Sequence, residues 1–134
     1  CGTLFPYTTL FRSLGEAVRT YIDKERERLT KLVEERPAYA ALHLGRLFKR
    51  VKGLPVHKTL WETLKPLVQD KELVRLVAIV KELTEVQETI EERGESRILD
   101  HKLKRIKTKL NDYAESDGPS DRLKSEAFDL AEEL

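Results

Sequence analysis

Few residues of this chain can do acid–base, metal or nucleophilic chemistry, and their spacing fits no familiar kind of site. His43, His57 and His101 lie far apart, and the sequence has neither His-Glu-x-x-His nor the Glu-x-x-His of bundle metal sites. Cys1 is the single cysteine, so it can form no internal disulfide and no cysteine metal cluster. Gly-rich phosphate loops and Ser/His/Asp sets are not found either. We therefore predict no enzymatic activity, no metal or other cofactor and no small-molecule substrate.

One basic stretch is a candidate binding site. Residues 37–61 include no acidic side chain. Lysine and arginine can contact phosphates, and a helix that begins near Thr59 would add the positive end of its dipole. Segment 43–58 is therefore a candidate nucleic-acid-binding site, and the alternative is a basic face that is neutralised by the acidic C-terminal tail or by Glu34 and Glu35. The candidate site residues are Arg46, Lys49, Arg50, Lys52 and Lys58.

This stretch resembles a helix–turn–helix DNA reader only loosely. Such readers have a small residue four positions before the turn glycine and an apolar residue nine positions after it. Counted from Gly53, these positions hold Lys49 and Glu62. The departure argues against direct reading of a base sequence.

A row of glutamates could hold a cation, but ion pairing along a helical hairpin explains it better. The row comprises Glu82, Glu85, Glu88, Glu91 and Glu92, and a second basic stretch follows over 101–109. The expected neighbours are Glu88 with Lys102, Glu85 with Lys104 or Arg105, and Glu92 with Arg97. Such exposed pairs contribute only about 0–1 kcal/mol each, but they help to fix the register of two helices.

Heptad-like spacing predicts the hairpin that positions these side chains. Apolar residues alternate in steps of three and four over 73–90 and again over 99–113. Gly94 suits a residue with positive φ that ends a helix, and Ser96 suits the N-cap of the next helix. We predict antiparallel helices at about 70–93 and 97–114. The expected seam pairs are Leu83 with Ile106, Val80 with Leu110, and Leu76 with Tyr113.

Caps and helix breakers predict the remaining helices. Ser13 could cap a helix that ends before Pro37, and Pro37 would begin the next helix, which Gly53 stops. Thr59 could cap a short helix that Pro66 should kink or end. Asp70 and Ser120 are the expected caps of the hairpin and of a last helix, respectively.

The composition agrees with a helical protein. Charged residues make up 37% of the chain and aromatic residues only 7%, which favours helices with charged surfaces over a β-sandwich. We predict an all-α antiparallel bundle of five to six helices built on the central hairpin. The predicted organisation is a bundle domain over 14–115, a linker over 116–120 and a C-terminal amphipathic helix over 121–134.

The N-terminal residues are interpreted separately. Residues 3–13 read Thr-Leu-Phe-Pro-Tyr-Thr-Thr-Leu-Phe-Arg-Ser, and this string resembles one reading frame of a constant adaptor used in short-read sequencing libraries. We interpret residues 1–13 as a non-native segment and exclude them from fold reasoning. The chain has no methionine and stops at Leu134 inside an amphipathic pattern, so we expect a fragment of a larger protein.

The last helix offers a second candidate binding surface. Leu123, Ala127, Phe128, Ala131 and Leu134 share one face, which could pack on a partner helix. We predict a protein-interaction or scaffolding module that binds a protein partner or self-associates, and the alternative is the nucleic-acid-binding module described above. The net charge is only +1, and no run of eighteen apolar residues predicts a membrane helix. A cytoplasmic location is the expectation.

Overall fold

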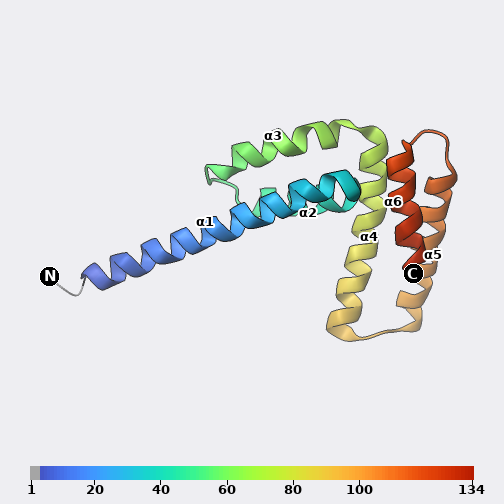
Figure 1. Cartoon of the computed structure of the whole chain (residues 1–134). Helices are drawn as coiled ribbons and strands as arrows, with labels where there is room; N and C mark the ends of the chain where they lie inside the picture. The colour runs from blue at the N-terminus through green and yellow to red at the C-terminus, as the bar shows by residue number, and fades with distance from the viewer. Residues whose placement is uncertain (1–3) are drawn as a thin grey trace.

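Six helices make up the part of the chain that the structure describes. This computed structural model describes residues 4–134, with side chains from residue 15 onward. The helices are α1 (Leu4–Glu35), α2 (Pro37–Arg50), α3 (Val56–Gln69), α4 (Lys71–Arg93), α5 (Arg97–Glu115) and α6 (Asp121–Glu132) (Figure 1). Residues 4–134 contain no strand, so the predicted all-α bundle of five to six helices is confirmed. None of the described helices has a stretch both long and apolar enough to cross a membrane.

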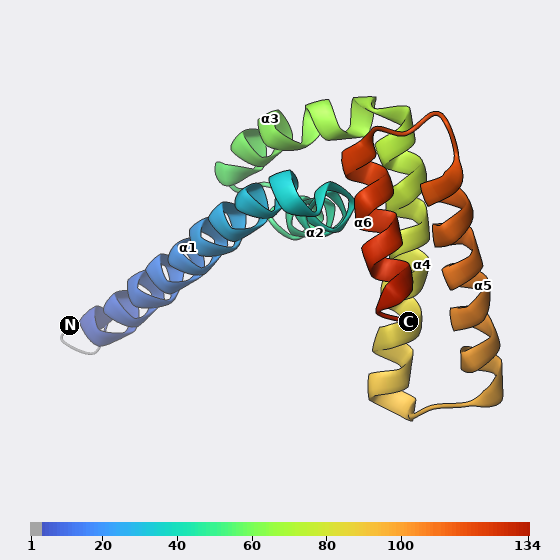
Figure 2. The ribbon, with the colours of Figure 1, turned by 45° about the vertical axis from the view of Figure 1, so that its right-hand side comes forward.

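The helices form two hydrophobic clusters that share α2. Helices α4, α5 and α6 lie side by side, whereas α1, α2 and α3 extend away from them (Figures 1 and 2). Ala38 and Leu42 of α2 belong to the cluster formed with α4, α5 and α6. Leu44 and Leu47 belong to the cluster formed with α1 and α3. Because α2 contributes to both clusters, it joins the two halves of the fold.

The predicted hairpin is formed by α4 and α5. Gly94 follows α4 with a φ of +84°, a conformation that glycine adopts without strain. The Ser96 hydroxyl accepts a hydrogen bond from a backbone N–H three residues later, at 3.2 Å. The Asp70 carboxylate caps α4 by accepting from the backbone N–H groups of Glu72 and Leu73, at 3.1 and 3.2 Å. The buried seam contains Leu76, Val80, Leu83, Ile106 and Leu110, as the heptad spacing predicts.

Two predicted helix starts are wrong, and one predicted helix breaker does not end its helix. The capping box at Ser13 lies inside a helix, because α1 already begins at Leu4. Thr59 is not a cap, since α3 begins at Val56, directly after Pro55, whose φ of −58° is already helical. Pro66 does not end α3, which continues to Gln69.

The adaptor-like segment is described only in part. Its first three residues lie outside the described residues, and residues 4–13 belong to α1, with side chains that are not described.

The C-terminal helix packs into the bundle instead of presenting a free apolar face. Helix α6 packs most extensively on α5. Leu123, Ala127 and Ala131 are buried in the cluster formed with α2, α4 and α5, and Leu134 packs partly buried against it. Phe128 remains 50% exposed. The face that the sequence offered to a partner helix is therefore mostly covered within this chain, because the short loop over 116–120 folds α6 back along the hairpin.

Helix α6 also holds the junction between α1 and α2. The Glu126 side chain is only 2% exposed, and its carboxylate accepts hydrogen bonds from the backbone N–H groups of Ala38 (2.9 Å) and Tyr39 (3.0 Å). These donors lie at the start of α2, where they have no partner within the helix. The Arg122 guanidinium donates to the backbone carbonyl of Glu34, near the end of α1, at 2.5 Å. Each charge has the sign that stabilises the helix terminus it meets.

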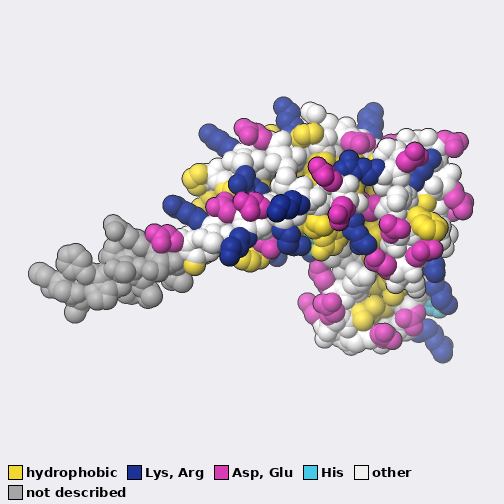
Figure 3. All heavy atoms as spheres, in the orientation of Figure 1, with side chains coloured by type: hydrophobic (Ala, Val, Ile, Leu, Met, Phe, Trp, Pro, Cys, Tyr) yellow, Lys and Arg dark blue, Asp and Glu magenta, His cyan; other side chains and the backbone are white. Residues whose placement is uncertain are grey.

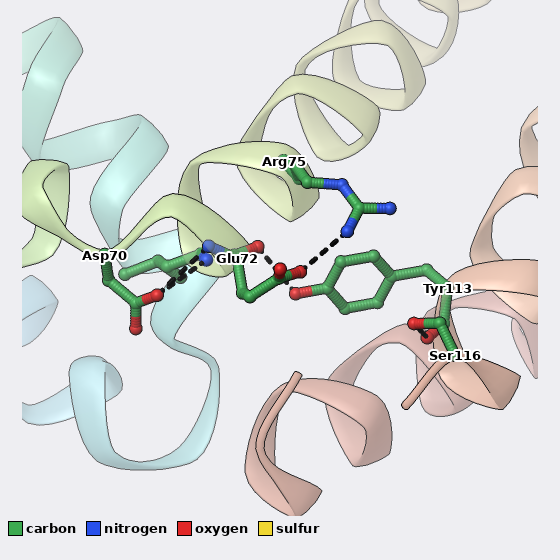
Figure 4. Close-up of polar contacts among 6 residues, drawn as sticks. Asp70, Glu72, Arg75, Tyr113 and Ser116 are labelled. Atoms are coloured by element: carbon green, nitrogen blue, oxygen red, sulfur yellow. Dashed lines mark hydrogen bonds and ion pairs between the residues drawn. The ribbon is translucent and has the colours of Figure 1, made fainter. Parts of the chain in front are cut away.

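Tyr113 ties the end of α5 to the start of α4 (Figure 4). Its hydroxyl donates a hydrogen bond to the backbone carbonyl of Glu72 at 2.6 Å. The carboxylate of Glu72 pairs with Arg75 at 2.8 Å, and the Arg75 guanidinium lies 5.7 Å from the centre of the Tyr113 ring. Burial raises the pKa of Tyr113 to about 12. The folded chain therefore favours the neutral phenol.

We expect this phenol to make stability fall in alkaline solution. The folded pKa of about 12 exceeds the ordinary value of about 10, so the contribution of the neutral phenol is complete below pH ~10 and is lost as the pH rises through about 12. The two-unit difference corresponds to about 3 kcal/mol. Urea unfolding from pH ~8 to ~11 should show the beginning of this loss. Tyr113→Phe should reduce the slope of unfolding free energy against pH, although the lost hydrogen bond costs about 1 kcal/mol at neutral pH.

The control is Tyr21→Phe, because Tyr21 is exposed on α1. This variant should keep the alkaline slope of the parent protein. Equal slopes for Tyr113→Phe and the parent protein would contradict the assignment.

Candidate functional site

The five predicted basic residues lie around the turn between α2 and α3. Arg46, Lys49 and Arg50 are on the last turns of α2, Lys52 is in the turn, and Lys58 is on the first turn of α3. The turn includes Gly53, whose φ is +91°, a conformation that other residues rarely adopt. The structure therefore brings the whole predicted set to one end of a helix pair.

Arg46 has an ion-pair partner that the sequence did not indicate. Its guanidinium pairs with the Glu88 carboxylate of α4 at 2.7 Å. The predicted neighbour of Glu88 was Lys102 on α5, and that prediction is wrong because α2 packs against α4 and places Arg46 within reach. Arg46 is thus part of the α2–α4 contact.

The other four cations face solvent. Lys49, Arg50, Lys52 and Lys58 are exposed and form no ion pair with the described residues. The acidic residues that the sequence offered as their partners either pair with another residue or face solvent. Glu133 of the C-terminal tail pairs with Arg36 at 2.6 Å, and Glu34 and Glu35 are exposed and make no ion pair with described residues. Internal neutralisation is therefore limited to Arg46.

Three aromatic side chains lie close together beside Lys58. The rings of Phe48 on α2 and His57 on α3 lie 3.9 Å apart, centre to centre, with planes 18° apart. Trp61, one turn further along α3, lies 5.6 Å from Phe48 and is 43% exposed. Together with Lys58 and Glu62, these rings line a shallow hollow of about 600 Å³. We call the following set the aromatic–basic surface: Phe48, Lys49, Lys52, His57, Lys58 and Trp61.

The sequence did not predict the aromatic half of this surface. In the sequence Trp61 lies among the apolar residues Leu60 and Leu64. In the structure Leu60 and Leu64 are buried and Trp61 is exposed. The available signal was the spacing of His57 and Trp61, four residues apart on one helix, which puts both rings on the same face.

The second basic stretch, on α5, is not neutralised as predicted. Lys109 pairs across the hairpin with Glu82 at 2.9 Å. Within the described residues, the expected pairs of Glu85 with Lys104 or Arg105 and of Glu92 with Arg97 do not form. Glu85 and Arg105 instead line the two sides of a groove of about 410 Å³ between α4 and α5.

The histidines do not gather. His43 is on α2 beside Tyr39, with ring centres 4.2 Å apart, and burial lowers its pKa. His57 stacks on Phe48, and His101 is exposed on α5. Among the residues that the structure describes, no group of three or more His, Cys, Asp or Glu side chains could hold a metal ion.

The basic character of the aromatic–basic surface is local. Figure 3 shows acidic and basic side chains interspersed over the visible face of the molecule, in agreement with the net charge of +1. Attraction of an anionic partner would therefore depend on the cations at the α2–α3 turn and would be strongly screened by salt. Comparison with protein-family models, with curated proteins and with solved structures gave no match for this chain.

Proposed function

We propose that this chain is a non-catalytic binding module that holds an anionic macromolecule on its aromatic–basic surface. One observation carries the proposal: an exposed tryptophan, tilted against Phe48, lines a hollow together with Lys58, which has no ion-pair partner among the described residues. An anionic polymer that contacts such cations releases condensed counterions, and this release favours binding.

The exposure of Trp61 supports a binding role over a purely structural one. Its ring is 43% exposed, although Leu60 and Leu64 of the same helix are buried. Tryptophan is enriched at binding interfaces because its large, rigid ring loses little conformational entropy on contact. Phe48 of α2 contacts both His57 and Trp61 of α3, so the aromatic group joins the two helices.

A titration with anionic polymers tests the proposal. We expect the chain to bind at least one of single-stranded DNA, duplex DNA and polyglutamate at low salt, with an affinity that falls steeply as salt is added. Replacing Lys49→Glu together with Lys58→Glu should weaken binding roughly tenfold or more, since two phosphate-type contacts become repulsive. Fluorescence anisotropy of a labelled polymer measures both effects.

The matched control is Lys104→Glu together with Lys107→Glu. Both lysines are exposed on α5, so this variant has the same net charge but an intact aromatic–basic surface. It should bind nearly as tightly as the parent protein. Absence of binding to all three polymers at low salt, or equal weakening by the control, would refute the proposal.

A second candidate is the association with a protein helix predicted from the sequence. The groove between α4 and α5 has Val86, Leu99 and Ile106 along its floor and sides. Acidic Glu82 and Glu85 lie on its α4 side, and basic residues line its α5 side. An amphipathic helix with complementary charges would fit such a groove. If a second copy supplies that helix, sedimentation equilibrium should show a dimer that Lys102→Glu together with Arg105→Glu, both exposed on the groove, converts to a monomer. A monomer at all concentrations would exclude self-association.

A further inference from the structure

We infer that the ligand of the aromatic–basic surface is a single-stranded nucleic acid, with a base stacked on Trp61 and phosphates on Lys58 and on the lysines at the end of α2 and in the following turn. This inference rests on the proposed function and specifies its ligand. It goes beyond charge attraction, because a lysine cluster alone would accept any polyanion.

The aromatic group distinguishes a nucleic acid from an acidic protein segment. Every nucleobase offers a flat π-face that stacks on an aromatic side chain, whatever the base sequence. The carboxylates of an acidic segment would contact the lysines and leave the Trp61 ring unused. Phe48 and His57 already stack on each other at 3.9 Å, so Trp61, at 43% exposure, is the ring best placed to receive a base.

The spacing of charge and ring suits a nucleotide chain. Lys58 and Trp61 are three residues apart on α3, so they are neighbours on the helix surface, with Cβ atoms about 5–6 Å apart. A base on Trp61 would therefore bring the phosphate beside it toward Lys58. Lys49 and Lys52 provide further exposed cations at the end of α2 and in the turn that leads to α3.

A single strand fits this surface better than a duplex. Bases in a duplex are stacked on one another, so their faces are available only when a strand is unpaired. Glu62 also lines the hollow. This carboxylate should weaken the binding of any phosphate chain, so its neutralisation is informative.

Trp61 provides its own reporter, because it is the single tryptophan of the chain. We expect a thymidine oligonucleotide of about 12 nucleotides to quench the Trp61 fluorescence on binding. An abasic oligonucleotide with the same backbone, and the matching duplex, should each bind at least about tenfold more weakly, because neither offers a free base. Polyglutamate should bind weakly and leave the fluorescence unchanged.

Variants separate stacking from charge. In anisotropy titrations with the labelled oligonucleotide, Trp61→Leu should reduce affinity about tenfold and Trp61→Phe should restore part of the loss. Lys58→Glu should weaken binding, whereas Glu62→Gln should strengthen it. All these side chains are exposed, so circular dichroism should confirm an unchanged fold.

The possible failures are distinguishable. Equal affinity for the abasic oligonucleotide, or unchanged affinity in Trp61→Leu, would overturn the inference and leave the proposed binding surface standing. Polyglutamate binding as tight as that of the oligonucleotide, with the same dependence on Lys58, would assign the surface to an acidic protein segment. No binding of any polyanion at low salt would overturn both the inference and the proposed function.

Discussion

Ile106→Asp should unfold the protein, whereas Ile98→Asp should leave it folded. Both residues are isoleucines of α5, but Ile106 is 3% exposed in the seam with α4 and Ile98 is 70% exposed. A carboxylate at position 106 would be buried without a partner and would also remove apolar contacts. The expected cost of several kcal/mol is comparable to the about 5–15 kcal/mol that separates folded and unfolded domains.

Thermal unfolding followed by circular dichroism checks this prediction. Leu83→Asp, on the facing side of the seam, should behave like Ile106→Asp, because Leu83 is buried in the same cluster. Ile98→Asp should melt cooperatively near the temperature of the parent protein. Native helix content with a cooperative transition in Ile106→Asp would show that the seam is placed incorrectly.

Glu126→Ala should destabilise the protein by about 2–3 kcal/mol, as measured by urea unfolding at neutral pH. The substitution removes the acceptor of the backbone N–H groups of Ala38 and Tyr39. It therefore leaves two donors unsatisfied in an otherwise buried position at the start of α2. Glu126→Gln should destabilise the protein less, because its amide oxygen can still accept a hydrogen bond from one of these two N–H groups.

The ion pair of Arg36 with Glu133 provides the control. Its partners are partly exposed, so Glu133→Ala should cost no more than about 1 kcal/mol. Burial raises the pKa of Glu126, against the opposing effect of its hydrogen bonds to Ala38 and Tyr39. The stability that this carboxyl confers should consequently decrease as the pH rises through its folded pKa, and Glu126→Gln should remove that dependence. A cost for Glu126→Ala no larger than that for Glu133→Ala would contradict the assigned role.

The hairpin could be predicted because its determinants are local. The heptad spacing, the glycine at position 94 and the caps Asp70 and Ser96 all act within a few residues of one another, and the structure has them as expected. The contacts of Glu126 with Ala38 and of Arg46 with Glu88 join residues 88 and 42 positions apart. They depend on how helices pack on one another, which the periodicity of a single helix does not specify.

The same reasoning explains the corrected role of α6. An amphipathic stripe such as that of Leu123 and Ala127 shows that a helix face must be covered, but it does not say by what. The loop over 116–120 is short enough to fold the helix back, and the stripe is buried within this chain. An apolar stripe in the sequence is therefore equally consistent with packing inside the same chain and with packing against a partner protein.

The sequence indicated the basic residues of the candidate site but not its aromatic residues. The absence of acidic residues from 37–61 is visible in the sequence, and four of the five predicted cations face solvent. The exposure of Trp61 depends on which side of α3 packs against α2. In the structure, α3 buries Leu60 and Leu64, and this orientation leaves Trp61 exposed.

Chemical-shift mapping by nuclear magnetic resonance tests the central claim most directly. A ¹⁵N-labelled chain would be titrated at low salt with the thymidine oligonucleotide, and with polyglutamate in parallel. We predict that the largest shifts fall within 48–62, with the Trp61 side-chain N–H among them. Shifts centred on the basic stretch 101–109 of α5, or no shifts with either polymer, would contradict the assignment of the aromatic–basic surface.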